Sequence, residues 1–225
     1  MKPFAFAVPA LLLAAPVQAQ TPREMLTHAS FQDRDKGAAL RRIVQAHASA
    51  TALLARNPND REAALMQATA LGYRAKLTGS RSDALAARRA MEALVRRAPG
   101  DPERHLVLGA WHMGAVYRLG RIVARAALGA SKPAGLQSLD RAVALGGDRA
   151  MYPGIAALLR IEMDPADQQG RRLAEAAARA AAPTAIDRHA RSAAQAVLAP
   201  LRAGNGEAAR RLAARLLPFG RIDVE

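Results

Sequence analysis

The sequence predicts an all-α protein built as an array of helical hairpins (an α-solenoid), with about nine or ten helices. Signals that start and stop helices recur along the whole chain, and one group of them is repeated. No segment alternates between apolar and polar residues as a strand does. Aromatic residues make up only 4% of the chain, and Ala, Leu and Arg dominate, which favours closely packed helices. A compact, irregular helical bundle is the alternative architecture.

The first residues have the pattern of an export signal. Lys2 gives a short positive start, residues 4–15 are apolar, and Val17-Gln18-Ala19 fits the small-x-small pattern that signal peptidase cleaves. The apolar run is too short for a membrane span, and no cysteine is present to carry a lipid anchor. We therefore expect cleavage after Ala19 and a periplasmic or secreted protein, with residues 20–225 as a single repeat domain.

Capping signals place the helices in order. Thr21-Pro22-Arg23-Glu24 is a capping box with proline at the first helical position, so a short helix is expected at 22–31. Later starts are marked by Asp164-Pro165-Ala166-Asp167 and by Thr184-Ala185-Ile186-Asp187, and glycines mark several helix ends. The further helices expected from these signals span residues 37–56, 60–77, 82–97, 102–128, 134–145, 149–162, 165–181, 185–202 and 206–217.

One turn occurs twice and defines the repeat. Residues 53–62 (LLARNPNDRE) match residues 94–103 (LVRRAPGDPE). In each copy an apolar and basic helix end runs into proline, and an aspartate then caps the next helix. One amphipathic hairpin cannot bury its apolar face alone, so neighbouring hairpins are expected to stack.

A longer stretch extends this pattern. The segment His105-Leu106-Val107-Leu108-Gly109-Ala110-Trp111-His112 is followed by Arg121, Ala124, Ala127-Leu128-Gly129, Ala134 and Leu139-Asp140-Arg141-Ala142-Val143-Ala144-Leu145. With the Pro–Asp turns it resembles the tetratricopeptide repeat, and over residues 90–165 the bacterial relatives of the regulator of microtubule dynamics family. The repeat here is longer than the family's usual length of about 34 residues, and the final third departs from the pattern. The resemblance implies a protein-interaction scaffold without a cofactor.

Signatures of catalysis are missing from the sequence. It contains no cysteine, no Gly-x-Ser-x-Gly elbow and no phosphate-binding glycine loop. His105 and His112 lie two turns apart on one expected helix, whereas metal-binding pairs on a helix are spaced by three or four residues. We therefore expect no enzyme, no cofactor and no metal site, and buried polar roles for the histidines.

The positive charge is the strongest functional signal. The chain has 33 Lys and Arg against 19 Asp and Glu, a formal net charge of +14. Guanidinium groups bind carboxylates and phosphates well, so acidic protein segments or lipid phosphates are the expected partners, although a solvated face has the same pattern. Nucleic acid is not expected, because aromatic residues for stacking are scarce. The candidate partner-binding residues are Arg88, Arg89, Arg96, Arg118, Arg121 and Arg125.

The most apolar expected helix, 102–128, contains the candidate groove residues Trp111 and Tyr117. Its glycines are costly in an isolated helix, so they are expected to admit the close approach of a neighbouring helix or a peptide. These are Gly109, Gly114 and Gly120.

The function that the sequence favours is a periplasmic scaffold that holds a protein or peptide partner. The alternative is a small-molecule or lipid carrier associated with envelope transport, which would need a closed apolar cavity around Trp111 and Tyr117. An enzyme of unrecognised type is the third hypothesis, and no residue supports it. The final helix, 206–217, either closes the array or lies on a membrane surface.

Overall fold

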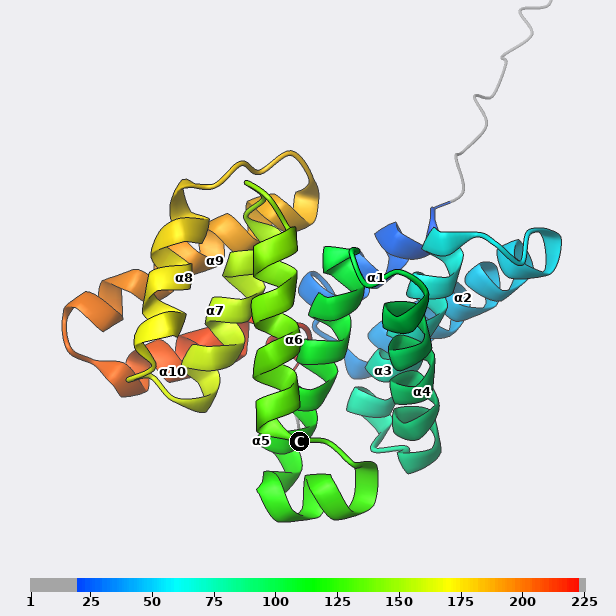
Figure 1. Ribbon diagram of the computed structural model, residues 1–225, viewed down its shortest axis with the longest axis horizontal. Coiled ribbons are helices and arrows are strands. Elements are labelled where there is room, and N and C mark those ends of the chain that lie inside the picture. The colour runs from blue at the N-terminus through cyan, green and yellow to red at the C-terminus, as the bar shows by residue number, and fades with distance from the viewer. Residues whose placement is uncertain (1–19, 223–225) are drawn as a thin grey trace, which may run out of the picture.

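The computed structural model describes residues 20–222, which form ten α-helices (Figure 1). The predicted all-α class is confirmed. The expected export signal in residues 1–19 lies outside the described residues, and within them no helix combines the length and apolar character of a membrane span. The helices are α1 (Pro22–Phe31), α2 (Lys36–Arg56), α3 (Arg61–Thr78), α4 (Arg81–Arg97), α5 (Pro102–Leu128), α6 (Lys132–Leu145), α7 (Met151–Met163), α8 (Gln168–Arg179), α9 (Ala185–Arg202) and α10 (Gly206–Leu216).

The predicted capping residues start and end these helices. Thr21 forms the capping box of α1, and the side chains of Asp60 and Asp101 accept backbone N–H bonds at the starts of α3 and α5. Gly79 and Gly129 adopt the left-handed conformation at the ends of α3 and α5. Local capping chemistry therefore determines most boundaries.

Helix α8 is shorter than predicted at both ends. Its N-cap is Asp167, whose side chain accepts the Gly170 N–H at 2.8 Å, while Asp164 lies at the end of α7. Asp164-Pro165-Ala166 is the turn itself, so the aspartate after the proline caps the helix, as Asp60 does after Pro58. At the other end, Ala181 leaves the helix to exchange backbone bonds with Asp148 and Ala150.

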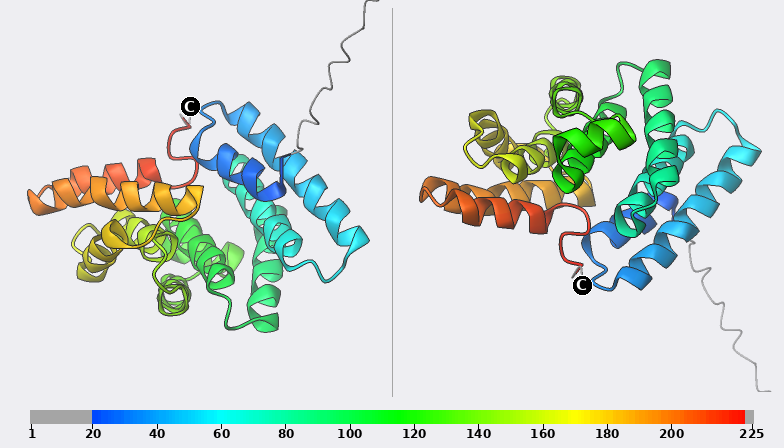
Figure 2. Two further views of the ribbon diagram at one scale, coloured as in Figure 1. Left: turned by 90° about the horizontal axis from the view of Figure 1, so that it is seen from above. Right: turned by 90° about the horizontal axis from the view of Figure 1, so that it is seen from below.

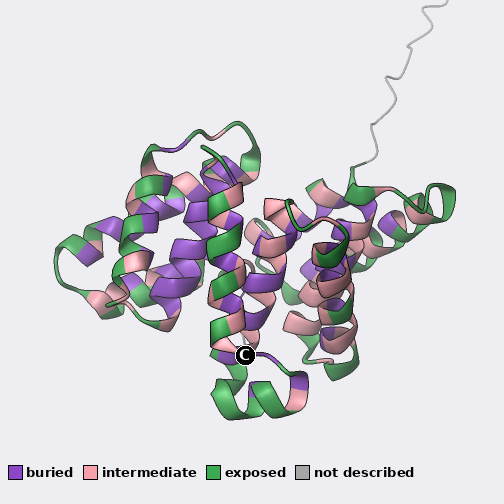
Figure 3. Ribbon diagram, viewed as in Figure 1, coloured by how far each residue is buried: buried purple, intermediate pink, exposed green. Residues whose placement is uncertain are grey.

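The helices pack in the order of the chain. Each contacts the next, and the odd-numbered helices α1, α3, α5, α7 and α9 also contact one another in succession. Helix α10 departs from this order, because it packs back against α7 and α9 (Figure 2). All residues of α7 except Met163 are buried (Figure 3). Helix α7 is therefore the central helix of the second half.

Two apolar cores lie on either side of α5. The N-terminal core is formed mainly by α1–α4, and the C-terminal core mainly by α6–α10. Helix α5 contributes Leu108 to the first and Leu106 and Met113 to the second. It therefore separates the halves and joins them.

The three glycines of α5 lie in different surroundings. A Cβ at Gly109 would lie 2.9 Å from the Leu139 side chain, so the expected close approach of a helix, here α6, is confirmed there. At Gly114 and Gly120 nothing lies within 4 Å of such a Cβ, so the predicted close approach of a helix was wrong for both, while a peptide at Gly114 stays a prediction. Gly120 has φ 74° and ψ 163°, which breaks the helix and turns its last part in a new direction.

Candidate functional site

A large cleft lies between the two halves of the molecule. Its volume is about 1690 Å³, and its walls come from α1, α3, α5 and α7, together with α10 and the residues after it. The contacts between successive odd-numbered helices place those four walls side by side. The wall residues used below are Ser30, Tyr73, Lys76, Trp111, Tyr117 and Glu162.

The chain itself supplies one side of this cleft. Residues 217–222, here called the tail segment, follow α10 and return to α1 and α3. The Phe219 N–H donates to the Ser30 carbonyl oxygen at 2.8 Å, and Lys76 Nζ donates to the Pro218 carbonyl oxygen at 2.9 Å. The tail segment is therefore held through its backbone, as a bound peptide would be.

Three side chains of the tail segment, those of Leu217, Phe219 and Ile222, are also buried. The Phe219 ring meets the Tyr73 ring edge-on at a centroid distance of 4.9 Å, and Lys76 Nζ lies 6.0 Å from the centre of the Phe219 ring. Phe219 and Ile222 belong to the N-terminal core. Phe219 has φ 64°, a conformation that costs a non-glycine residue roughly 1–3 kcal/mol. The surrounding contacts offset that strain.

A buried carboxyl group lies in the opposite wall. Glu162 on α7 is 8% exposed and lines the cleft, and it has no hydrogen-bond partner within residues 20–222. Burial raises its pKa to about 7, and the charge of Lys76 partly opposes this. Burial likewise lowers the pKa of Lys76, which Glu162 opposes and Arg118 reinforces. The cleft therefore contains a carboxyl group without a hydrogen-bond partner in the described residues, and an amine that binds the tail segment through Pro218.

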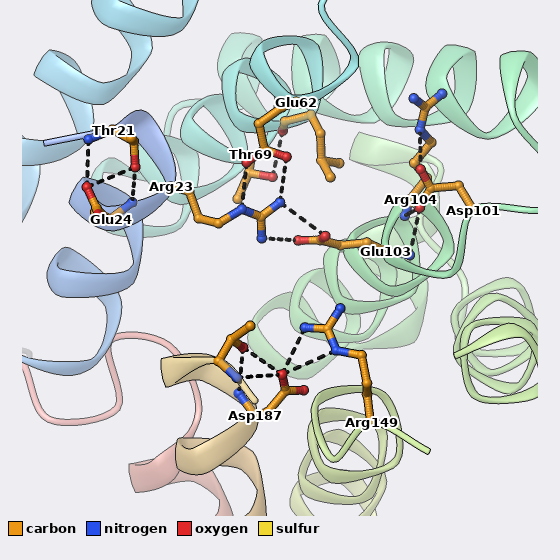
Figure 4. Close-up of polar contacts among 12 residues, drawn as sticks. Thr21, Arg23, Glu24, Glu62, Thr69, Asp101, Glu103, Arg104, Arg149 and Asp187 are labelled. Carbon is orange, nitrogen blue, oxygen red and sulfur yellow. Dashed lines mark hydrogen bonds and ion pairs between the residues drawn. The ribbon is translucent and has the colours of Figure 1, made fainter. Parts of the chain in front are cut away.

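One arginine ties three walls of the cleft together. Arg23 on α1 binds Glu62 of α3 at 2.5 Å and Glu103 of α5 at 2.6 Å (Figure 4). Figure 4 also shows Arg149 beside Asp187, which links the start of α7 to α9. These pairs hold the walls of the cleft in fixed relative positions.

The structure distributes the six predicted arginines over different environments. Arg118 lines the cleft and donates to the Lys76 carbonyl oxygen. Arg88 bonds to Glu92 and to the Leu128 carbonyl oxygen, so it fastens the end of α5. Arg89 and Arg96 are exposed on α4, and Arg121 and Arg125 are exposed near the end of α5. Of the six, only Arg118 lines the cleft.

The two predicted groove residues do lie in the cleft. Trp111 is half-buried and packs against residues of the N-terminal core, whereas Tyr117 is 46% exposed at the rim. The exposed rim contrasts with the closed cavity that a carrier was expected to need.

The histidines have ordinary structural partners. His105 Nε2 lies 2.9 Å from the Pro99 carbonyl oxygen, and His112 Nδ1 accepts the Ser131 N–H at 3.3 Å. Burial lowers the pKa of His112, and Arg88 lowers it further. Across residues 20–222 no three His, Cys, Asp or Glu side chains are grouped as a metal site would require.

The final helix, α10, packs on the C-terminal core. On its apolar face Leu217 is buried, and Leu212 and Leu216 are partly buried. These leucines face the C-terminal core, which favours a packing role over contact with a membrane surface, and the role of α10 as the end of a repeat array stays a prediction.

Several residues of the cleft were missed at the level of sequence. Lys76, Tyr73 and Phe219 come together only through tertiary contacts. Glu162 carried a usable signal, because it is a charged residue in an otherwise almost wholly apolar helix.

No family model, no curated protein and no solved structure matches this chain. The function is therefore inferred from the cleft and the surface.

Proposed function

We propose that this protein is an exported, non-enzymatic scaffold whose cleft binds a protein or peptide segment. The observation that carries the proposal is the tail segment, which occupies one side of the cleft with its backbone bonded to Ser30 and Lys76 and an aromatic side chain buried. Export rests on the N-terminal sequence pattern. In this proposal the tail segment is an internal substitute for the partner.

A tetratricopeptide-like array is the architecture that fits this proposal. The chain-order packing, with odd-numbered helices in successive contact, supports stacked hairpins whose first helices line one shared surface. Helix α10 would then act as the closing element. The Pro–Asp turns before α3 and α5 supply the repeat.

The size of the cleft favours a peptide over a small ligand. Small-molecule pockets usually enclose roughly 300–1,000 Å³, and this cleft encloses about 1690 Å³. A partner segment that replaces the tail segment would present a backbone carbonyl to Lys76, a backbone N–H to Ser30 and an aromatic side chain to Tyr73. Glu162 would accept or donate a bond on the opposite wall.

The proposal is tested by separating the tail from the cleft. A chain that ends at Leu216 is titrated with a labelled peptide of residues 217–225, and binding is followed by fluorescence anisotropy. We expect saturable binding that weakens at least about tenfold with Lys76→Met, because a charge-assisted bond is worth about 1.5–3 kcal/mol. The matched control is Lys36→Met on exposed α2, which should leave binding unchanged.

Circular dichroism establishes first that the shortened chain is folded. If a folded chain fails to bind the peptide, or binds the Phe219→Ala peptide equally well, the cleft is not a peptide site.

The carrier hypothesis is favoured by one observation, the buried polar pair Lys76 and Glu162 in a mainly apolar cleft. It predicts that a fluorescent fatty-acid analogue binds the chain with its tail segment in place and quenches Trp111, the single tryptophan. Peptide binding to the shortened chain with no binding of the analogue would exclude it.

A further inference from the structure

The end of α5 forms an unusually exposed part of the molecule. Residues 117–123 are all exposed, and Gly120 turns the chain so that the last part of α5 crosses one end of the molecule (Figures 1 and 3). We call residues 117–128 the tip.

The tip concentrates the exposed apolar side chains of the described residues. Within residues 20–222, six large apolar side chains are exposed, and four of these six belong to the tip. Ile122 is 85% exposed, and Val123 is 52% exposed. The other two tip residues are Tyr117 and Leu119, and the two outside it are Val44 and Leu53 of α2. Exposed apolar side chains gathered in this way mark interaction sites.

The tip is packed and hydrogen-bonded to α4, although its outer residues are exposed. Ala124 and Leu128 are buried in a small core of their own with Ala84 and Val116. Arg81 Nε donates to the Ala127 carbonyl oxygen at 3.1 Å, and Arg88 donates to that of Leu128 at 2.8 Å. The apolar side chains of this packed element are therefore presented to solvent. Tyr117, Leu119 and Val123 also line the cleft, whereas Ile122 does not.

The charge of the tip is positive only. Arg118, Arg121 and Arg125 are exposed, and none of them forms an ion pair within residues 20–222. No acidic residue occurs between Glu103 and Asp140. The surface thus combines apolar side chains with unpaired guanidinium groups.

We propose that the tip is a docking surface for a bilayer that contains anionic lipid. The apolar side chains would enter the boundary between headgroups and acyl chains, and the guanidinium groups would bind lipid phosphates. A stable protein interface buries about 800 Å² on each partner, from roughly 20–30 residues, which a projecting patch of four apolar residues does not supply alone. Interfacial binding needs only a few apolar groups together with positive charge.

The proposal is tested by sedimentation with vesicles. The protein begins at Gln20, because residues 4–15 are apolar and would bind lipid themselves, and this chain retains all ten helices. We expect binding to vesicles of phosphatidylglycerol and phosphatidylcholine but not to pure phosphatidylcholine. Ile122→Asp and Arg121→Glu should each lower the partition coefficient about tenfold, since each places a negative charge at the anionic surface.

The matched controls are on α2. Val44→Asp and Arg41→Glu make the same changes at exposed positions outside the tip, and they should leave binding within about twofold, because long-range attraction by net charge falls off within a Debye length. Equal losses in tip and control variants would mean that binding is non-specific attraction by the net charge, and the proposal fails.

A second measurement detects directly which part of the protein contacts the bilayer, without comparing the partition coefficients of variants. Because the chain has no cysteine, Ile122→Cys and Val44→Cys can each carry one polarity-sensitive dye. A blue shift on anionic vesicles at position 122 and none at 44 is expected. No shift at either position, or capture of a protein that Ile122→Asp abolishes without any vesicle binding, would overturn the membrane assignment. Among the four exposed apolar residues of the tip, Ile122 alone does not line the cleft, so the dye at this position reports vesicle contact separately from peptide binding in the cleft.

Discussion

The two halves of the molecule bury their helices in different ways. In the N-terminal half, α2 is amphipathic and buries a single row of residues, Ala39, Ile43, Ala46 and Ala50. In the C-terminal half, α7 is surrounded by α5, α6, α8, α9 and α10 and is buried along nearly its whole length. A helix that is apolar all round belongs in the middle of a core, whereas an amphipathic one covers its edge. The polar groups at the ends of α7 must therefore find partners inside the protein, whereas those of α2 can reach water.

The two capping boxes show this difference directly. The box of α1, Thr21 with Glu24, is exposed to solvent. The box of α9, Thr184 with Asp187, is built around a carboxylate that is fully buried. Asp187 also binds Arg149 at 2.9 Å and accepts the Met151 N–H at 3.1 Å. Helix α7 has no side-chain cap of its own, so Asp187 caps two helices.

Asp187→Ala is expected to have the largest effect on stability. Loss of the carboxylate removes the cap of two helices and leaves the buried Met151 N–H without its partner, which together cost about 2–5 kcal/mol, whereas the partly exposed Arg149 can bond to water. The equivalent change in the other box, Glu24→Ala, should cost much less stability, because water replaces the bonds that the exposed carboxylate loses. Urea denaturation of both variants measures the difference. Similar losses would show that the halves do not differ in this respect.

Acid should weaken both boxes, because hydrogen bonds from Thr21 lower the pKa of Glu24 as well. Hydrogen bonds from Arg149, Thr184 and Met151 outweigh the effect of burial and lower the pKa of Asp187. Stability from a lowered carboxyl pKa is present above the unfolded value and is lost as the pH falls through the folded value.

Much of the fold could be predicted because it is encoded locally. Proline–aspartate turns, Thr–x–x–acid boxes and glycine ends determine helix boundaries through the residues next to them, and the caps at Asp60, Asp101 and Gly129 were identified in this way. The error at α8 arose because the two aspartates around Pro165 compete for the same role. The error at Gly120 arose because a glycine in an apolar helix has several uses, and only the neighbours decide among them.

The cleft was less predictable because its residues meet only after folding. Arg23, Glu62 and Glu103 lie on three helices, and no periodicity links them. The arginine-rich sequence of α4 and of the end of α5 predicted a partner-binding surface there. In the structure, however, Arg88 donates a hydrogen bond to the Leu128 carbonyl oxygen. Composition reports how many charges a chain carries, and only packing reports which of them remain free.

Glu162→Gln is expected to have the next largest effect on stability. Glu162 lines the cleft between the two halves. The pKa of Glu162 is about 7 in the folded protein, against an ordinary value of 4.5. The folded state therefore binds more protons than the unfolded state between these values, and stability falls as the pH rises through that window. We expect the variant to gain about 3 kcal/mol at pH 8 and almost nothing at pH 4.

Unfolding in urea at pH 4, 6 and 8 checks this prediction. Glu175→Gln on exposed α8 is the matched control and should show no such trend. Measurements stay at or below pH 8, because the lowered pKa of Lys76 makes its own contribution in the alkaline range. A wild-type stability that does not fall between pH 4 and 8 relative to the variant would mean that Glu162 is solvated or paired.

The smallest expected effects on stability come from two helical glycines, one in the central helix α7 and one in the cleft wall formed by α5. A Cβ at Gly154 of α7 would lie 2.9 Å from the Ala190 Cβ and 3.0 Å from the Ala190 carbonyl oxygen. Because part of that obstacle is backbone, α7 and α9 must separate, and overpacking of this kind costs about 1–3 kcal/mol. At Gly114 of α5, nothing lies within 4 Å of the added carbon, so alanine should gain about 0.5–1 kcal/mol from helix propensity.

Thermal unfolding measures the change in stability for both variants. A loss for Gly154→Ala with a gain for Gly114→Ala would show that α7 is tightly packed and that the cleft wall at Gly114 of α5 is open. Destabilisation by both would mean that the cleft is closed around Gly114 in solution, with another group in contact there. Stabilisation by both would mean that α7 and α9 tolerate a methyl group between them. In that case the central helix of the C-terminal half is packed no more tightly than the amphipathic helices of the N-terminal half.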